Sequence, residues 1–392
     1  MPVGTVSEEA LAALLATKGK WTKGVPWWNE ISLDAIKHFS WALGETNPLY
    51  LDQEHGKKSR WGAVQAFPCI VFSTVRARPW SWGLPGVQAL QAGERLEWSQ
   101  PVLLGMKVRA WSRLSELIEK PSRHAGRAWD QINEIAYVNI NDGTVVGHVF
   151  SMNKRFEGGR TQEAPKRKTY EGFSRHIYTD KELAQIERDA LSEQVRGANQ
   201  RYWEDVVEGE EIPPVVYGPL TVSDEVIWIA GDGGPFRFTG KEKWEYWRRH
   251  PGAKIMMKEW NTPEFPEAIH WEPAMARVFG APDAFDVGVQ RTTWLARAAT
   301  NWQGDDGFLR RLDAQTRGFN FIGDTTWCRG RVTRKFTEGP ENLAELDLWG
   351  VNQRGETTAK ATAVVSLPSR KRGPITLPRP PRAEDWGIDY RS

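Results

Sequence analysis

The chain repeats one structural plan twice, and this repeat constrains its fold more than any other feature. The 392 residues contain two similar segments, near 1–152 and 201–367. In the first, Ser32 precedes a helical pattern of apolar residues over 33–43. In the second, a similar pattern starts at residues 223–225. The repeat predicts two units of the same architecture within one chain.

Each predicted helix is followed by several long stretches with β-strand character. In both halves a glycine-containing turn separates the later strands. One helix followed by long strands, twice over, predicts an α+β fold with antiparallel sheets. The predicted strands include 107–111 and 145–152 around the turn 141–143 in the first half, and 325–329 and 357–367 around the turn 353–355 in the second.

Two further segments lie outside the repeat. Residues 153–200 read as a linker with one helix, because Thr179 and Glu182 form a capping box before an apolar stripe. Residues 368–392 are rich in proline and arginine, and we expect a solvated extended tail there.

Composition excludes several classes of function. Lys plus Arg total 52 and Asp plus Glu total 50, so the net charge is only +2 and no global field attracts nucleic acid. No apolar run approaches the ~20 residues that span a bilayer, and no signal peptide is recognisable. The two cysteines and seven histidines show no disulfide framework or zinc spacing. We therefore expect a cytoplasmic protein without a metal or a membrane partner. The 21 tryptophans suggest large flat side chains in the core or in a pocket for a bulky or ring-bearing group.

Short motifs in both halves resemble one known family. Residues 44–52 read GETNPLYLD, and the second half carries GDGGP at 231–235 and IHWE at 269–272. These motifs resemble the signature of the MaoC-like, (R)-specific enoyl-CoA hydratases. Residues 202–210 look like the usual entry to such a domain, and 321–325 look like its later Gly-Asp strand.

The resemblance implies a double hot-dog fold, in which two antiparallel sheets each wrap a central helix. It also implies a lyase that hydrates a trans-2-enoyl thioester or dehydrates a 3-hydroxyacyl thioester. The substrate would be carried on CoA or an acyl-carrier protein, and no other cofactor is implied. We further expect a homo-oligomer, with a dimer as one form.

The first half departs from the family signature at its chemical positions. Glu45 stands where the family has a catalytic Asp, and Tyr50 stands where it has His. A phenol with a pKa near 10 is a poor base at neutral pH. We therefore interpret the first half as a degenerate copy that supplies scaffold and pocket walls.

The second half keeps an acid and an imidazole, Asp232 and His270, separated by an insertion. By the resemblance, these two residues would hold the water that attacks C3 while a proton moves to C2. The backbone N–H groups of Gly288 and Val289, before a predicted helix at 290–301, are candidates for stabilising the thioester oxygen. A rival alignment keeps the motif contiguous over 265–270. It places Phe265 at the acid position and leaves Glu264 or Glu267 as the acid.

The second half is interrupted by 33 extra residues at 236–268, rich in aromatic and basic side chains. One interpretation is a surface helix that packs its aromatic residues on the body. The other is a lid over the acyl pocket whose cations attract CoA phosphates. The candidate substrate-binding residues are Trp244, Trp247, Arg248, Arg249 and Trp271.

The sequence is also compatible with two other functions. A hot-dog acyl-CoA thioesterase would need one carboxylate and no Asp/His pair. A non-catalytic acyl-CoA-binding or partner subunit would explain why one half is degenerate and the other interrupted.

Overall fold

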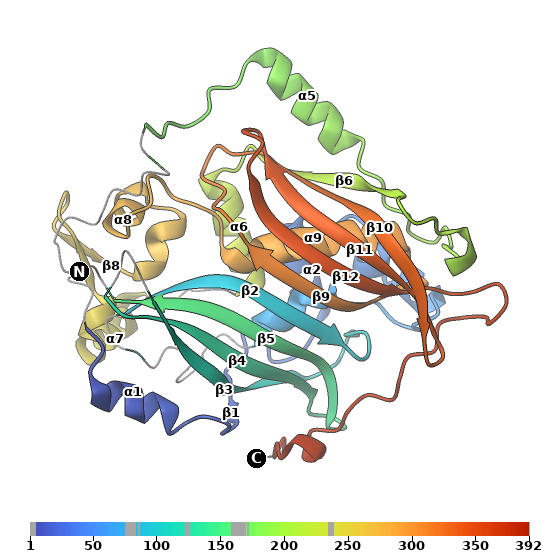
Figure 1. Ribbon diagram of the computed structural model, residues 1–392, viewed down its shortest axis with the longest axis horizontal. Coiled ribbons are helices and arrows are strands. Elements are labelled where there is room, and N and C mark those ends of the chain that lie inside the picture. Colours follow the sequence, from blue (N-terminus) through green and yellow to red (C-terminus); the bar gives the residue numbers. More distant parts are fainter. Residues whose placement is uncertain are drawn as a thin grey trace.

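The computed structural model describes residues 5–74, 84, 87–121, 126–157, 170, 172–233 and 239–391. Its main feature is one ten-stranded antiparallel sheet that curves around a layer of helices (Figure 1). The strand order is β1-β3-β4-β5-β2-β9-β12-β11-β10-β6. The second half of this order mirrors the first, so the repeat in the sequence is a pseudo-two-fold repeat in space. The predicted α+β double hot-dog architecture is confirmed.

The two halves of the sheet join at the antiparallel pair β2 and β9, where Gly93 pairs with Gln315 and Glu97 with Arg311. Each half sheet has four long strands and a shorter strand at its outer edge. The first-half strands are β1 (Thr22–Lys23), β2 (Gln88–Trp98), β3 (Val108–Lys120), β4 (Ala128–Asn139) and β5 (Thr144–Phe156). The second-half strands are β6 (Glu211–Tyr217), β9 (Phe308–Thr316), β10 (Thr326–Glu338), β11 (Glu341–Asn352) and β12 (Thr357–Ser366).

Helices α2 (Leu33–Leu43) and α6 (Val222–Asp232) are the repeated helices, and they pack against each other. Ser32 caps α2 through the backbone N–H of Ala35, as predicted, and Thr221 caps α6 through that of Asp224. In both helices the twelfth residue after the N-cap is a left-handed glycine, Gly44 or Gly233. The two helices are therefore equivalent turn by turn.

This equivalence changes the register expected from the motifs. Gly233, and not Gly231, corresponds to Gly44, so Asp232 lies where α2 has Leu43. Gly231 instead allows the close approach of the two helices, since a Cβ there would lie 2.4 Å from the Ala42 side chain. The residue that follows Gly233 as Glu45 follows Gly44 is Gly234, and it lies outside the described residues together with Pro235.

The central helix of the second half is α9 (Gly288–Gln303), which is buried along almost its whole length. Its first-half counterpart contains the 3-10 helix η1 (Pro68–Thr74), which is buried from Cys69 to Thr74. Helix α9 lies on the face of the sheet that also carries α2 and α6 (Figure 1). The remaining short helices are α1 (Glu8–Leu15), α3 (Pro48–Leu51), α4 (Gln53–Lys58), η3 (Trp203–Asp205) and η6 (Glu384–Trp386).

The linker contains α5 (Asp180–Leu191), with the predicted capping box of Thr179 and Glu182. The helix lies outside the sheet near β6 (Figure 1). Linker residues 158–169 and 171 lie outside the described residues.

The insertion forms a small unit with its own core. Its described part contains α7 (Gly240–Arg249), η4 (Pro251–Ala253), the hairpin β7 (Ile255–Met257) and β8 (Thr262–Glu264), and the start of η5 (Pro266–His270). Ile255, Met257 and Ala268 pack with Met275 of α8 (Pro273–Val278). Its first residues, 236–238, lie outside the described residues.

The C-terminal segment differs from the solvated tail that its proline and arginine content predicts. Residues 383–390 cover the outer face of the first-half sheet, where Ala383, Ile388 and Tyr390 pack with Trp111 of β3. Trp386 stacks on Trp21, with ring centroids 6.3 Å apart. The few apolar residues among the arginines and prolines are sufficient anchors, because they meet an apolar sheet face that would otherwise be exposed.

Much of the tryptophan excess serves packing. Of the tryptophans that the structure describes, seven are buried, in different parts of the fold: Trp98, Trp111, Trp129, Trp228, Trp247, Trp294 and Trp302. Among the described residues, no helix is both long and apolar enough to cross a membrane.

Candidate active site

His270 is the last residue of the 3-10 helix η5 in the second half. Its Nδ1 is 2.8 Å from the Phe285 carbonyl oxygen, and its ring meets the Phe285 ring edge to face at 5.2 Å. A carbonyl can only accept, so Nδ1 carries the proton and Nε2 keeps a lone pair. Burial lowers the pKa of His270 to about 4, and the positive charge of Arg291 acts in the same direction. The imidazole is therefore neutral at pH 7.

The repeat supports the assignment of His270 to the motif position. In the first half, Tyr50 meets the ring of Phe67 edge to face at 5.5 Å. Both phenylalanines follow an alanine just before their own central helix. His270 and Tyr50 thus occupy equivalent places, with an imidazole in one half and a phenol in the other.

Helix α9 begins three residues after Phe285, the residue whose carbonyl oxygen accepts the His270 hydrogen bond. Gly288 and Val289 are the first two residues of this helix, so their backbone N–H groups have no partner within it. A Cβ at Gly288 would lie 2.2 Å from the side-chain oxygen of Gln91 on β2. A side chain at position 288 would displace the Gln91 amide, so a residue of the first half lies against the start of α9.

Asp286 lies beside this helix start and is completely buried. Its carboxylate is 2.9 Å from Arg291 Nε and accepts a 2.8 Å hydrogen bond from the Asn320 amide. Burial raises the pKa of Asp286 to about 6, while Arg291 and Asn320 oppose the shift. Through these contacts Asp286 fixes the loop that contains Phe285, whose carbonyl oxygen accepts the hydrogen bond from His270.

Glu225 of α6 is a second buried carboxyl near the same helix start. Both of its carboxyl oxygens are buried, and no described residue forms a hydrogen bond of standard geometry with them. Burial raises the pKa of Glu225 well above its usual value, and the negative charge of Asp286 adds to this shift. The side chain of Gln290 and the backbone of Val287 oppose the shift. The equivalent residue of α2 is Ile36, so the second half carries an acid at an apolar core position.

Asp232 lies at the opposite end of α6. It is buried, and its charge acts on the thiol of Cys69 in η1. His270, by contrast, contacts Phe285 and is influenced by Arg291. Among the described residues, no hydrogen bond or ion pair joins Asp232 to His270, and the pairing of these two residues stays a prediction.

The first-half motif forms a buried polar network. Glu45 accepts hydrogen bonds from the backbone N–H groups of Thr46 and Asn47, each at 2.8 Å. Its other oxygen is 3.6 Å from Arg297 Nε, and Arg297 also binds Glu193 at 2.5 Å. These contacts tie the first half to α9 and the linker.

The predicted substrate-binding residues lie in different environments. Trp247 is buried against Phe265 and belongs to the core of the insertion, whereas Trp244 is 54% exposed. Arg248 and Arg249 are exposed at the end of α7. Trp271 packs partly against the main core.

The residues of the rival alignment lie close to the insertion core. Phe265 is part of that core, and Glu264 accepts a hydrogen bond from the Phe265 backbone N–H. Glu267 has one buried carboxyl oxygen. Among the described residues, no group of three or more His, Cys, Asp or Glu side chains is placed to hold a metal ion.

Sequence reasoning overlooked Glu225 and Asp286. From the sequence, Glu225 is a polar residue in the first turn of the second-half helix, although it lies in the apolar stripe of α6. Alignment with Ile36 would have revealed an acid at a core position. Asp286 carries no comparable signal, because an aspartate before a helix is common for reasons of capping alone.

Comparison with known proteins agrees with this architecture. Residues 16–146 match the family model of the FAS1-like dehydratase domain region. No curated protein matches the sequence.

Solved structures match over nearly the whole chain. A MaoC-like dehydratase aligns with a TM-score of 0.62 at 14% identity, covering 90% of this chain and 99% of its own. A putative MaoC domain protein dehydratase from Chloroflexus aurantiacus gives 0.55 at 12% identity, with 90% and 96% covered. A double hot-dog protein from Mycobacterium tuberculosis gives 0.51 at 11% identity, with 89% and 96% covered. At these identities the structures establish the fold. The chain is therefore a double hot-dog protein, and its residues 16–146 are similar to a dehydratase domain family.

Proposed function

We propose that this protein is a hydro-lyase that hydrates a trans-2-enoyl thioester or dehydrates a 3-hydroxyacyl thioester. The observation that carries the proposal is the His270 imidazole, which is neutral, oriented through Nδ1 and, like Tyr50 in the first half, edge to face on a phenylalanine ring. A neutral imidazole with a free Nε2 can accept a proton from water. The dehydratase family model over 16–146 supports the same reaction class.

In the proposed mechanism, His270 and Asp232 activate and hold the water that adds to C3. The proton delivered to C2 completes the addition across the double bond, and the reverse sequence removes water. The Gly288 and Val289 N–H groups stabilise the negative charge that develops on the thioester oxygen. The thioester is carried on CoA or an acyl-carrier protein, and the reaction needs no further cofactor.

A second candidate function is an acyl-thioester-binding protein without turnover. The register of α6 favours it, because the position equivalent to Glu45 falls on Gly234. Neither half then holds both an acid and an imidazole at the repeat-equivalent positions.

One experiment separates the two candidates. Loss of enoyl-thioester absorbance is measured with the unmodified protein and with His270→Ala, and thiol release is followed in parallel. Enoyl loss that depends on His270, without thiol release, supports the hydro-lyase. Tight binding of the thioester without loss of absorbance supports the binding protein and contradicts the proposed activity.

A further inference from the structure

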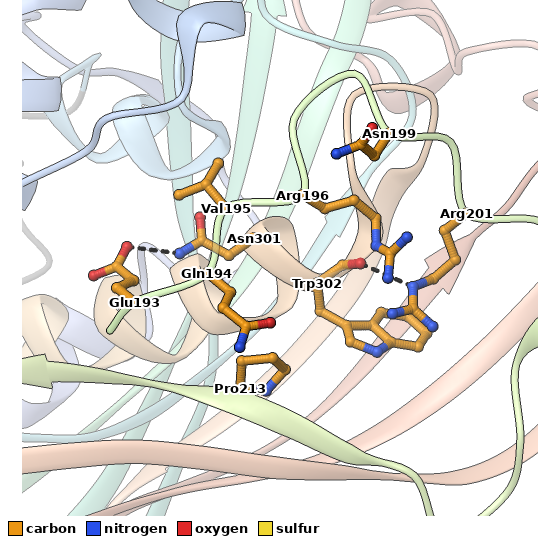
Figure 2. A pocket seen from close by; sticks show the side chains of 9 residues that line it. All are labelled: Glu193, Gln194, Val195, Arg196, Asn199, Arg201, Pro213, Asn301 and Trp302. Carbon is orange, nitrogen blue, oxygen red and sulfur yellow. Dashed lines mark hydrogen bonds between the residues drawn. The ribbon is translucent and has the colours of Figure 1, made fainter. Parts of the chain in front are cut away.

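A pocket of about 380 Å³ lies between the linker, β6 and the C-terminal end of α9, away from the His270 segment. The linker forms most of its wall, with Pro213 and two residues of α9 completing it (Figure 2). Its lining is mainly polar. The lining residues are Glu193, Gln194, Val195, Arg196, Asn199, Arg201, Pro213, Asn301 and Trp302.

Two arginines bring like charges together in this pocket. Arg201 is only 9% exposed and is fixed by Glu210 at 2.8 Å and by the Trp302 carbonyl at 3.0 Å. Its guanidinium also lies over the Trp302 ring, 4.3 Å from the centroid. The side chain of Arg196 extends to the same region (Figure 2). Burial lowers the pKa of Arg201, and the positive charge of Arg196 lowers it further.

The Arg196 side chain packs against the backbone, but no acidic side chain in the described residues pairs with its charge. Its methylene groups lie on Gly304, where a Cβ would come within 3.1 Å of them. Within the described part of the chain its guanidinium forms no ion pair, and the side-chain amides of Gln194 and Asn199 form no hydrogen bonds. Three side chains around the pocket therefore keep unused hydrogen-bond donors.

The acidic groups nearby are already engaged. Glu193 binds Arg297 at 2.5 Å and Asn301 at 2.9 Å, and Glu210 binds Arg201. The carbonyls at the end of α9, where the helix dipole is negative, also have partners. That of Asn301 accepts the Arg196 backbone N–H at 3.1 Å, and that of Trp302 accepts Arg201 Nε. The pocket therefore retains an excess of positive charge and free donors.

We infer that this linker pocket binds a phosphate-bearing ligand through Arg196 and Asn199, with Arg201 as a fixed positive charge beside them (Figure 2). A phosphate oxygen accepts several charge-assisted hydrogen bonds at once and offsets the repulsion between the two guanidinium groups. The phosphate comes either from the CoA part of a thioester or from a separate phosphorylated molecule. The inference does not depend on catalytic turnover.

The test measures binding of inorganic phosphate, ADP and CoA to the full chain by calorimetry. Arg196→Gln is compared with Arg188→Gln, which removes the same charge from exposed α5 of the same linker. We expect Arg196→Gln to weaken phosphate and ADP binding by about tenfold or more, since hydrogen bonds to charged groups are of this strength. Arg188→Gln should leave binding within about twofold, because charges outside the pocket are screened by salt.

Asn199→Ala serves as a milder variant whose folding is less at risk, and thermal melts accompany every variant. We expect it to weaken phosphate binding about two- to tenfold, through loss of one neutral donor. If CoA binding also depends on Arg196, the phosphate belongs to the thioester carrier. If phosphate and ADP bind but CoA does not, a separate phosphorylated ligand is indicated. Absence of binding by all three probes, or binding that Arg196→Gln and Asn199→Ala leave unchanged, would overturn the inference.

Discussion

The two halves carry different chemical groups at one pair of corresponding side chains. Tyr50 and His270 each lie edge to face on a phenylalanine, but their acid–base chemistry is opposite. Burial raises the pKa of Tyr50 well above 10, so the phenol stays protonated and cannot act as a base. Burial lowers the pKa of His270, so the imidazole stays neutral and can act as one. The first-half phenol and the second-half imidazole are therefore both uncharged at neutral pH, but only the imidazole has a basic nitrogen.

This difference predicts an asymmetric response to mutation. His270→Ala should lower kcat/KM on an enoyl-CoA by roughly 10²–10⁴, the usual effect of removing a positioned acid or base. Under the proposed pairing, Asp232→Asn falls in the same range and the double variant is little worse than either single one. Steady-state kinetics on one enoyl-CoA, with folding checked by thermal melts, provide the measurement.

The controls are the equivalent residues of the first half. Glu45→Gln and Tyr50→Phe should change the rate of the folded protein by less than about tenfold, a barrier change below ~1.4 kcal/mol. A large loss for Glu45→Gln together with a small one for Asp232→Asn would place the reaction in the first half.

A second residue-scale prediction concerns the buried carboxyl of Glu225. Its pKa is raised in the folded protein, so below the unfolded pKa of about 4.3 both states are protonated and no penalty arises. As pH rises above that value, the unfolded state ionises first and the folded protein loses relative stability. Glu225→Gln removes this penalty. The gain in Tm over the unmodified protein should therefore be larger near pH 8 than near pH 5.

Thermal melts at both pH values test this, with Glu242→Gln on the exposed side of α7 as the matched control. The control should show the same small difference at both pH values. A Tm difference for Glu225→Gln that does not grow with pH would show that the carboxyl is not the source of a pH-dependent penalty.

The limits of sequence reasoning are also visible at single residues. Either Gly231 or Gly233 is suited to the C-cap of α6, and the sequence alone does not distinguish the two positions. Packing decides, because Gly231 is required for the close contact with Ala42 and Gly233 for the left-handed cap. That choice moves Asp232 into the helix, and it depends on a contact between residues almost 190 positions apart.

At the scale of elements, local signals predicted local structure well. The Ser32 cap, the capping box at Thr179 and the apolar stripe of α2 all depend on neighbours within a few residues. The two-fold order of the strands followed from the repeat itself. The insertion was recognisable only by length and composition, because its hairpin β7–β8 and its core have no counterpart in the other half.

The insertion predicts different effects at its two neighbouring tryptophans. Trp247→Ala should destabilise the insertion by about 3–5 kcal/mol, since a fully buried aromatic side chain is lost. Trp244→Ala should cost less, about 0.5–1.5 kcal/mol, because Trp244 is 54% exposed and the change removes its edge-to-face ring contact with Trp247. Hydrogen exchange over residues 239–268 would report the difference.

Removal of the whole insertion tests its role as a lid. Replacing 236–268 by a short turn should weaken thioester binding more than it lowers Tm, if the basic and aromatic side chains contact the substrate. Normal binding and turnover by the shortened protein would leave the insertion as a packing unit only.

At the scale of the whole molecule, the C-terminal segment joins both ends of the chain. Trp386 stacks on Trp21 and meets His148 of β5 edge to face at 4.8 Å, while the Trp386 carbonyl accepts the Trp21 indole N–H. Composition suggested a solvated tail because prolines and arginines dominate it. Only a few apolar residues of the segment contact the sheet, and their partners lie more than 230 residues earlier in the chain. Local sequence patterns cannot predict contacts at such a separation.

These contacts predict that Trp386→Ala destabilises the first half by about 1–3 kcal/mol, the range for losing a packed aromatic contact. Trp260→Ala, at a tryptophan that is 52% exposed, is the matched control. Limited proteolysis should cut the first-half strands sooner in Trp386→Ala than in the control. Equal cutting rates would mean that the segment rests on the sheet without stabilising it.

The position of this segment also bears on the order of events during protein synthesis. The apolar sheet face around Trp111 and Val145 is completed by Ala383, Ile388 and Tyr390. At about 5–20 residues per second, a ribosome needs roughly 10–50 s to pass from residue 145 to residue 383. For that time the first-half sheet is translated but uncovered. A nascent chain of this protein therefore exposes an apolar surface that chaperones can bind, until residues 383–390 emerge and cover it.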